Sequence, residues 1–102
     1  MSIKKQLLKT KPEANVTFQL PAEAAEGAGK VALVGEFNDW DTTATEMKKL
    51  KSGDFKATVK LETGKEYQFR YLIDGQKWEN DWDADKYVPN QLTFEENSVV
   101  EL

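Results

Sequence analysis

The sequence contains no cysteine and no histidine, and these two absences exclude several common kinds of functional site. Without cysteine the chain can form no disulfide bond. Without either residue type it lacks the usual ligands of zinc and the usual base and nucleophile of hydrolytic enzymes. Catalysis would have to rest on carboxylates, lysines or hydroxyl groups alone. We therefore expect no metal ion, no cofactor and no enzymatic activity.

Long hydrophobic runs and an excess of basic charge are also absent. The first residues begin like a signal peptide, but the chain returns to charged residues after Leu7 and Leu8, and no stretch approaches the length of a membrane span. The 14 basic residues are outnumbered by 18 acidic ones, so the formal net charge is −4. This balance argues against nucleic acid as a partner. We expect a cytoplasmic protein without a membrane partner.

The 102 residues are enough for one domain with a modest core, and we interpret residues 1–102 as a single domain. Residues 1–10 are either frayed or an added edge strand. The lysines in and just after this region, Lys4, Lys5, Lys9 and Lys11, favour an edge strand, because lysine protects exposed strand edges from unwanted pairing.

Alternation of apolar and polar residues predicts several short strands separated by turn signals. It is clear in residues 16–20, 55–62 and 67–73, and a last strand is expected at 98–102. Residues 31–36 are apolar at nearly every position, which indicates a central strand covered on both faces. Residues 22–30 are expected to form a loop that could hold one helical turn. The pattern predicts an all-β, immunoglobulin-like antiparallel β-sandwich with these core residues: Val16, Phe18, Leu33, Phe55, Val59, Tyr67, Phe69, Tyr71 and Val99.

Two tryptophans stand just beyond strands of this pattern. Trp40 follows the strand break at Asn38 and Asp39, and Trp78 follows the turn at Asp74 and Gly75. A tryptophan needed only for packing would more often lie inside the alternation. Flat aromatic faces at strand ends suit the apolar face of a pyranose ring. Sugar binding is therefore the hypothesis that these residues suggest.

The length of the turn after Ile73 decides where Trp78 points. With a two-residue loop, Ile73 pairs with Gln76, and Trp78 lies opposite Tyr71 on the core face. With a three-residue loop, Trp78 lies opposite Leu72 and beside Arg70 on the outward face. We favour the three-residue loop, since the core would otherwise have to hold Trp78 beside Tyr71. An outward Arg70 could bind hydroxyl groups, pair with an acidic side chain or stack on Trp78.

The segment around Trp82 has aspartates at every second position, as in a calcium-binding loop. The match fails further on, because the expected glycine is Lys86 and the expected bidentate glutamate is Leu92. Asp81 and Asp83 could in principle serve as the acid and base of a glycosidase, but such pairs usually come from different strands of a deep cleft. We interpret the segment as a solvated loop anchored by Trp82.

Three segments together resemble carbohydrate-binding module family 48. They are residues 34–40 (Val-Gly-Glu-Phe-Asn-Asp-Trp), residues 67–76 from Tyr67 to Gln76, and residues 97–100 (Asn-Ser-Val-Val). The family includes the N-terminal early-set domains of isoamylases and glycogen-branching enzymes, and the glycogen-binding domain of AMP-activated protein kinase β subunits. The resemblance covers about residues 31–102, and residues 3–20 are similar to small bacterial single-domain members.

The resemblance implies an early-set β-sandwich that binds α-1,4-linked glucans such as glycogen, starch or maltooligosaccharides without catalysis. Trp40 and Trp78 would stack on glucose rings, Arg70 would hydrogen-bond sugar hydroxyls, and Leu92 and Asn97 would lie in the last binding loop. This sequence departs from the kinase-type domains in three places. Arg70 stands where they have lysine, Lys77 is inserted before Trp78, and residues 91–96 make the last loop about one residue longer.

Two other functions are compatible with the same sequence. The domain could dock onto a glycogen-metabolising or amylolytic enzyme, with the tryptophans as interface anchors and no sugar bound. A small glycosidase that uses carboxylates is the third and least favoured reading. Release of reducing sugar from a glucan would support this last function.

Overall fold

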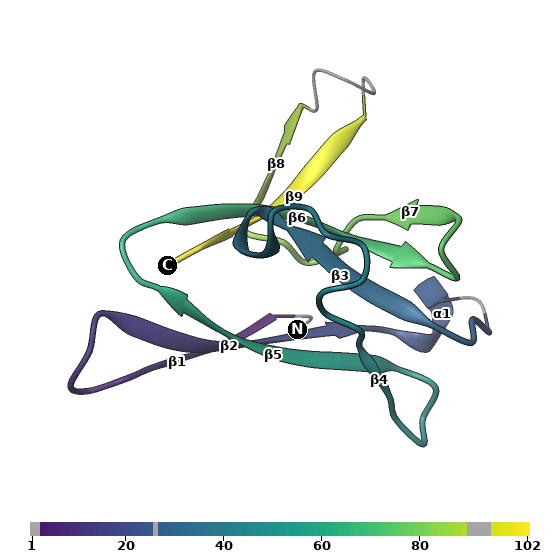
Figure 1. The fold of residues 1–102 in the computed structure, drawn as a ribbon, viewed down its shortest axis with the longest axis horizontal. Helices are drawn as coiled ribbons and strands as arrows, with labels where there is room; N and C mark the ends of the chain where they lie inside the picture. Colours follow the sequence, from purple (N-terminus) through teal and green to yellow (C-terminus); the bar gives the residue numbers. More distant parts are fainter. Residues whose placement is uncertain (1–2, 26, 90–94) are drawn as a thin grey trace.

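The strands form two antiparallel sheets that pack face to face, as a computed structural model shows (Figure 1). The structure describes residues 3–25, 27–89 and 95–102. The first sheet has the strand order β1-β2-β5-β4. The second has the order β3-β6-β9-β8, and β7 pairs with β6. The prediction of an all-β, immunoglobulin-like antiparallel sandwich is confirmed.

The first sheet consists of β1 (Ile3–Leu7), β2 (Glu13–Leu20), β4 (Lys48–Lys49) and β5 (Phe55–Glu62). Of the two interpretations of the N-terminal residues, the edge strand is correct, because β1 pairs with β2 from Ile3 onward. In β5, buried and exposed residues alternate as the sequence predicts for a strand with one wet face.

The second sheet consists of β3 (Val31–Gly35), β6 (Glu66–Ile73), β7 (Lys77–Glu79), β8 (Lys86–Pro89) and β9 (Glu96–Glu101). The sequence reading missed β8, which is only four residues long and ends at a proline. The single helical turn α1 (Ala22–Ala25) and the short 3-10 helix η1 (Glu36–Asn38) complete the elements. In the part of the chain that the structure describes, no helix is long and apolar enough to cross a membrane.

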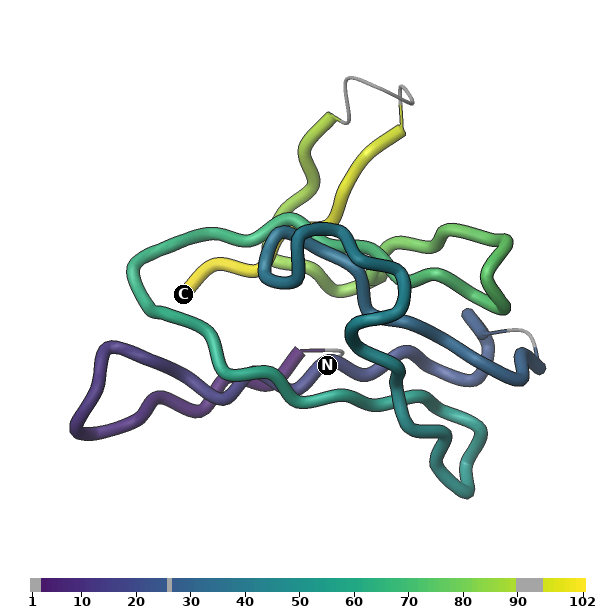
Figure 2. The backbone as a smooth tube through the Cα atoms, viewed as in Figure 1, coloured from purple at the N-terminus to yellow at the C-terminus, as the bar shows by residue number. Residues whose placement is uncertain are grey.

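The position of β3 differs from the prediction. The strand is covered on both faces as expected, but it lies at one end of the sheet rather than in its centre. The chain that follows η1 closes the open edge, because Leu33 N–H donates to the Thr45 carbonyl and Met47 N–H to the Val31 carbonyl. Figure 2 shows this segment passing from the second sheet to the first, where it enters β4. A short bridging segment therefore replaces the neighbouring strand that the apolar pattern indicated.

Aromatic rings dominate the core between the sheets. The ring of Phe18 lies edge-on to Phe69, with centroids 4.9 Å apart, and 5.7 Å from the ring of Phe37. Seven of the nine predicted core residues are buried, and Val59 and Tyr67 are half-buried against the core. Val99 was predicted to face the core between the sheets, and this is wrong, because Val99 pairs with the outward residue Gln68. It is buried on the outer side of the second sheet.

A buried polar network holds the loop between β7 and β8. The Tyr71 hydroxyl donates to Asp81 Oδ2 at 2.6 Å, and Asp81 N–H donates to Ser98 Oγ at 2.8 Å. The Tyr87 hydroxyl donates to the Asp81 carbonyl at 2.6 Å. Asp81 is 1% exposed, whereas Trp82 is 53% exposed. The interpretation of Trp82 as the anchor of this loop is therefore wrong, because hydrogen bonds to Asp81 perform that role.

Replacing Tyr71 with phenylalanine is expected to lower the free energy of unfolding by about 2 kcal/mol, because it removes the buried hydrogen bond that the Tyr71 hydroxyl donates to Asp81 Oδ2. Burial raises the pKa of Tyr71 well above its usual value, and the charge of Asp81 and their hydrogen bond act in the same direction. A tyrosine whose pKa is raised by folding contributes stability that is complete below its unfolded pKa of about 10 and is lost at higher pH.

The stability difference between the parent protein and Tyr71→Phe should therefore shrink as the pH rises above about 10. Urea unfolding at a series of pH values measures it. Tyr67→Phe is the matched control, because the Tyr67 hydroxyl bonds the Glu62 carbonyl at an exposed position. An equal loss in both variants, or a Tyr71→Phe difference that grows with pH, would contradict the proposed role of the network.

Candidate functional site

The hairpin between β6 and β7 has the three-residue loop that places Trp78 on the outward face. Ile73 pairs with Lys77 and Leu72 with Trp78, so residues 74–76 form the loop. Asp74 and Gly75 have φ angles of 51° and 68°, and Gln76 N–H donates to the Ile73 carbonyl at 3.0 Å. The backbone thus makes a tight turn and leaves Gln76 as one extra residue before the ladder resumes. The favoured register is confirmed.

The side chain of Asp74 fixes this turn against the neighbouring strand. Its Oδ1 accepts hydrogen bonds from Gly29 N–H at 3.0 Å and Lys30 N–H at 2.9 Å. Aspartate tolerates the left-handed backbone better than most residues do, and here the carboxylate also accepts from two backbone N–H groups that lie just before β3. The hairpin that carries Trp78 is therefore tied to the start of β3.

Trp78 and Arg70 form a stacked pair on the outward face of the second sheet. The Arg70 guanidinium carbon lies 5.5 Å from the centroid of the Trp78 ring, within the range of a cation–π interaction. The indole is 39% exposed, whereas Arg70 is only 5% exposed. Arg70 Nη2 lies 3.6 Å from Glu95 Oε2, and Arg70 Nε has no hydrogen-bond partner among the described residues. In this arrangement the guanidinium supports the indole, and the indole faces solvent.

Trp40 projects from an unusual turn at the end of β3. Asp39 and Trp40 both have positive φ angles, 56° and 58°. The left-handed region costs free energy for any residue with a side chain, and a bulky residue is rare there. Trp40 N–H donates to the Gly35 carbonyl at 2.9 Å, and the side chain stays 38% exposed. The fold therefore holds an exposed aromatic residue in a strained conformation, which is typical of functional positions.

The residues before Trp40 explain how the turn is held. Phe37 packs its ring against Phe18 and against Tyr67, with centroids 5.7 and 6.3 Å apart. Asn38 Oδ1 accepts from Gly35 N–H at 3.0 Å, and Asn38 Nδ2 donates to the Leu33 carbonyl at 2.9 Å. One apolar and one amide side chain thus fasten η1 to β3 and to the core. Trp40 therefore lies beside Gly35, the last residue of β3, which pairs with Phe69.

The remaining candidates lie on β9 and just before it. Asn97 is 4% exposed and donates from Nδ2 to Gln68 Oε1 at 3.0 Å. Because Phe69 pairs with Ser98, the next position of the ladder sets Asn97 beside Arg70 on the outward face. Leu92, the fifth predicted site residue, lies outside the described residues.

The structure brings Arg70, Trp78 and Asn97 together on one face and holds Trp40 at the adjoining end of β3. Sequence reasoning missed Gln68 and Glu95, which contact Asn97 and Arg70. Gln68 could have been found, since it shares the outward face of β6 with Arg70 in the alternating pattern. Glu95 could not have been found, because it lies before β9 and outside any alternating pattern. Among the residues described, no three acidic side chains gather closely enough to hold a metal ion.

Comparison with known proteins gives one family. A search of curated proteins found no match. A family model described as the glycogen recognition site of AMP-activated protein kinase matches residues 16–99, which cover most of the chain and include every candidate site residue. This match agrees with the motifs around Trp40 and Trp78 and with the β-sandwich that carries them. The chain belongs to this family of glycogen-recognition domains, a type of carbohydrate-binding module.

Proposed function

We propose that this domain binds α-1,4-linked glucans, such as glycogen or maltooligosaccharides, by stacking glucose rings on exposed tryptophans, and that it does so without catalysis. The observation that carries the proposal is the register of the β6–β7 hairpin. It places Trp78 outward, 39% exposed and supported by Arg70 at 5.5 Å. A ring held in this way offers a flat apolar surface whose orientation is set before the ligand arrives.

Trp40 is proposed as the second stacking residue. A strained turn in which a large aromatic residue stays 38% exposed gains nothing for the core, so a binding role accounts for it better than packing does. Arg70 is proposed to position Trp78. Asn97 is proposed to help set the outward face through Gln68, and Leu92 keeps the role that the family resemblance implies.

The expected affinity is modest. Stacking one sugar ring on one indole buries enough apolar surface for about 2 kcal/mol. Hydrogen bonds from sugar hydroxyls largely exchange with bonds to water, and association itself costs several kcal/mol. Two stacked rings therefore give a dissociation constant on the order of tens of micromolar to millimolar.

A docking function is the second candidate, and the outward face of the first sheet favours it. Lys48 lies directly opposite Lys56, and both side chains are exposed. Like charges directly opposite each other destabilise a sheet, and an acidic partner surface would offset that cost. This face belongs to the other sheet, so glucan binding and docking onto an enzyme of glucan metabolism are separable functions.

Isothermal titration with maltoheptaose tests the proposed function. Trp78→Ala and Trp40→Ala should each weaken binding by about tenfold or more, since each removes one stacking surface. Trp82→Ala is the matched control, because it removes an indole that is even more exposed but lies in the loop held by Asp81. Lys56→Gln serves as a control for the opposite face. Both controls should bind like the parent protein.

Two results would overturn the proposal. One is a parent protein that shows no saturable binding of maltoheptaose at millimolar concentration. The other is an equal loss of affinity in Trp82→Ala and Trp78→Ala. The non-catalytic part of the proposal is checked in the same mixtures, since reducing ends released from glycogen over hours would reveal a hydrolase.

A further inference from the structure

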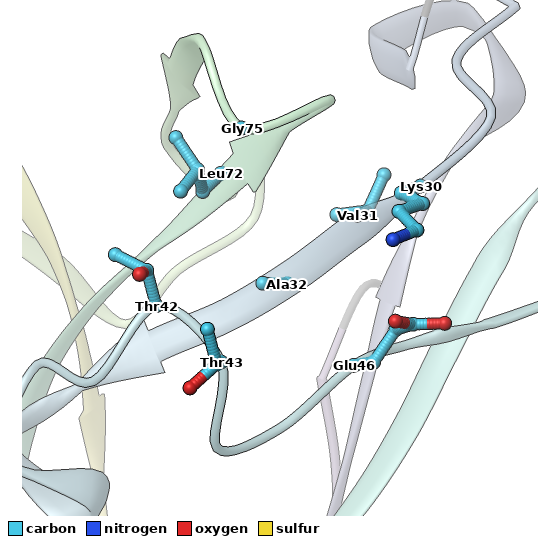
Figure 3. Close-up of a pocket in the computed structure, with 8 residues that line it drawn as sticks. All are labelled: Lys30, Val31, Ala32, Thr42, Thr43, Glu46, Leu72 and Gly75. Atoms are coloured by element: carbon cyan, nitrogen blue, oxygen red, sulfur yellow. The ribbon is translucent and has the colours of Figure 1, made fainter.

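A hollow of about 450 Å³ lies on the outward face of β3, next to the hairpin that carries Trp78. Figure 3 shows Ala32 between the β6–β7 hairpin on one side and the segment after Trp40 on the other. The volume is within the usual range of small-molecule sites. The residues that line it are Lys30, Val31, Ala32, Thr42, Thr43, Glu46, Leu72 and Gly75.

Strand register explains both the hollow and its place beside Trp78. Ala32 pairs with Leu72 on one side and with Glu46 on the other, and Leu72 pairs in turn with Trp78. Directly paired residues share a face, so all four side chains stand in one row on the outward surface. Ala32 has the smallest side chain of the row and forms the floor. Trp78 is two strands away, about 10 Å at the usual strand spacing.

The walls of the hollow combine apolar surface with hydroxyl and charged groups. Leu72 and Ala32 supply the apolar part, and Thr42 and Thr43 bring hydroxyl groups from the loop after Trp40. Glu46 and Lys30 add one negative and one positive charge, so the lining carries no net charge. No ion pair or side-chain hydrogen bond holds either of these two charged groups within residues 3–25, 27–89 and 95–102.

This chemistry fits a neutral ligand with many hydroxyl groups. A balanced pair of charges has no preference for an anion or a cation, but carboxylate, ammonium and threonine groups can all bond to hydroxyls. An apolar floor beneath such groups is typical of sites that hold one face of a sugar ring. The hollow therefore shares the chemistry of the surface around Trp78.

We propose that the hollow over Ala32 is a second subsite, which holds one glucose unit of a glucan chain while another unit of the same chain stacks on Trp78. The inference rests on the proposed function and extends it to ligand length. The span from Trp78 to Ala32 is about 10 Å, so a chain of several glucose units reaches both positions, whereas one ring or two directly linked rings cannot. The domain then prefers longer glucans to short ones, and the residues around Ala32 set that preference.

Filling the hollow tests the subsite. In Ala32→Leu the larger side chain occupies the floor from an outward strand position, while Trp78 and Arg70 are unchanged. We expect the ratio of maltoheptaose to maltose affinity to fall by about fivefold or more in isothermal titration, because the two rings of maltose cannot occupy both positions. Thr42→Val, which keeps the shape and removes one hydroxyl group, should lower the same ratio by a smaller factor. Thr58→Leu places the same leucine side chain on the outward face of the other sheet and should leave the ratio unchanged.

The outcomes separate this inference from the proposed function. If the parent protein binds maltoheptaose and Trp78→Ala weakens binding as expected, but Ala32→Leu and Thr42→Val keep the parent ratio, the subsite is wrong and the stacking site stands. If the parent protein binds neither oligosaccharide, both proposals fail. Near-ultraviolet circular dichroism shows whether each variant is folded, and Thr42→Val provides the test should Ala32→Leu not fold.

Discussion

Replacement of Phe18 by alanine is expected to lower the free energy of unfolding by about 3–5 kcal/mol, the largest effect we predict for a single side chain. Phe18 is completely buried between the two sheets. Its ring contacts Phe69 from the second sheet and Phe37 from η1, so one truncation removes contacts to two other elements. The cavity left in a close-packed core adds to the loss of buried apolar area.

The matched control for this variant is Leu7→Ala. Leu7 lies on β1 and is 68% exposed, so the same kind of truncation should change stability by less than about 0.5 kcal/mol. Urea unfolding followed by circular dichroism measures both variants. A loss below about 1 kcal/mol for Phe18→Ala would contradict the description of this ring as the centre of the core.

Replacement of Gly35 by alanine is expected to destabilise the protein by about 3 kcal/mol and to weaken glucan binding as well. A Cβ atom at position 35 would lie 2.6 Å from the Gln68 carbonyl oxygen and 2.8 Å from Phe69 Cβ. The φ angle of −171° is extended and suits alanine, so the cost is entirely steric. The backbone of β6 has to move away, and the ladder between β3 and β6 is disturbed.

Binding is affected because Gly35 also positions Trp40. Its carbonyl accepts the Trp40 N–H, and its N–H donates to Asn38 Oδ1. A displaced Gly35 therefore shifts the turn that presents the indole. Gly29→Ala is the control, since a Cβ there meets only Asp74 Oδ1 at an ordinary 3.7 Å. Equal stability of Gly35→Ala and Gly29→Ala in urea unfolding would show that the close approach of β3 and β6 is not required.

The sequence predicted the fold where a local pattern decides the structure. The alternation in β5 and β6 identified each strand and the face that it buries, because only one face of β5 carries apolar side chains. The edge position of β3 could not be predicted in this way. Residues 45–47, which pair with β3 beside its open edge, are mostly polar and have no strand pattern of their own. Tertiary hydrogen bonds decide their conformation.

The candidate site was predicted to a similar extent. The turn at Asp74 and Gly75 indicated the register of Trp78, since the alternative would have required an indole in the core. The burial of Arg70 was not foreseen, because it depends on how far the Trp78 ring extends over β6. The role of Ala32 could not be predicted from the sequence either, since a small residue in an apolar strand is expected to lie in the core. Only its pairing with Leu72, which in turn pairs with Trp78, shows that the Ala32 side chain points outward.

The most direct test of glucan binding uses the three indole N–H signals of the protein in a nuclear magnetic resonance titration with maltoheptaose. The three tryptophans, Trp40, Trp78 and Trp82, give one signal each. Stacking sites at Trp40 and Trp78 predict that these two signals shift together along one saturable curve while the Trp82 signal stays in place. Glucan binding through Trp40 and Trp78 is contradicted if no indole signal moves at millimolar glucan, or if the Trp82 signal alone shifts.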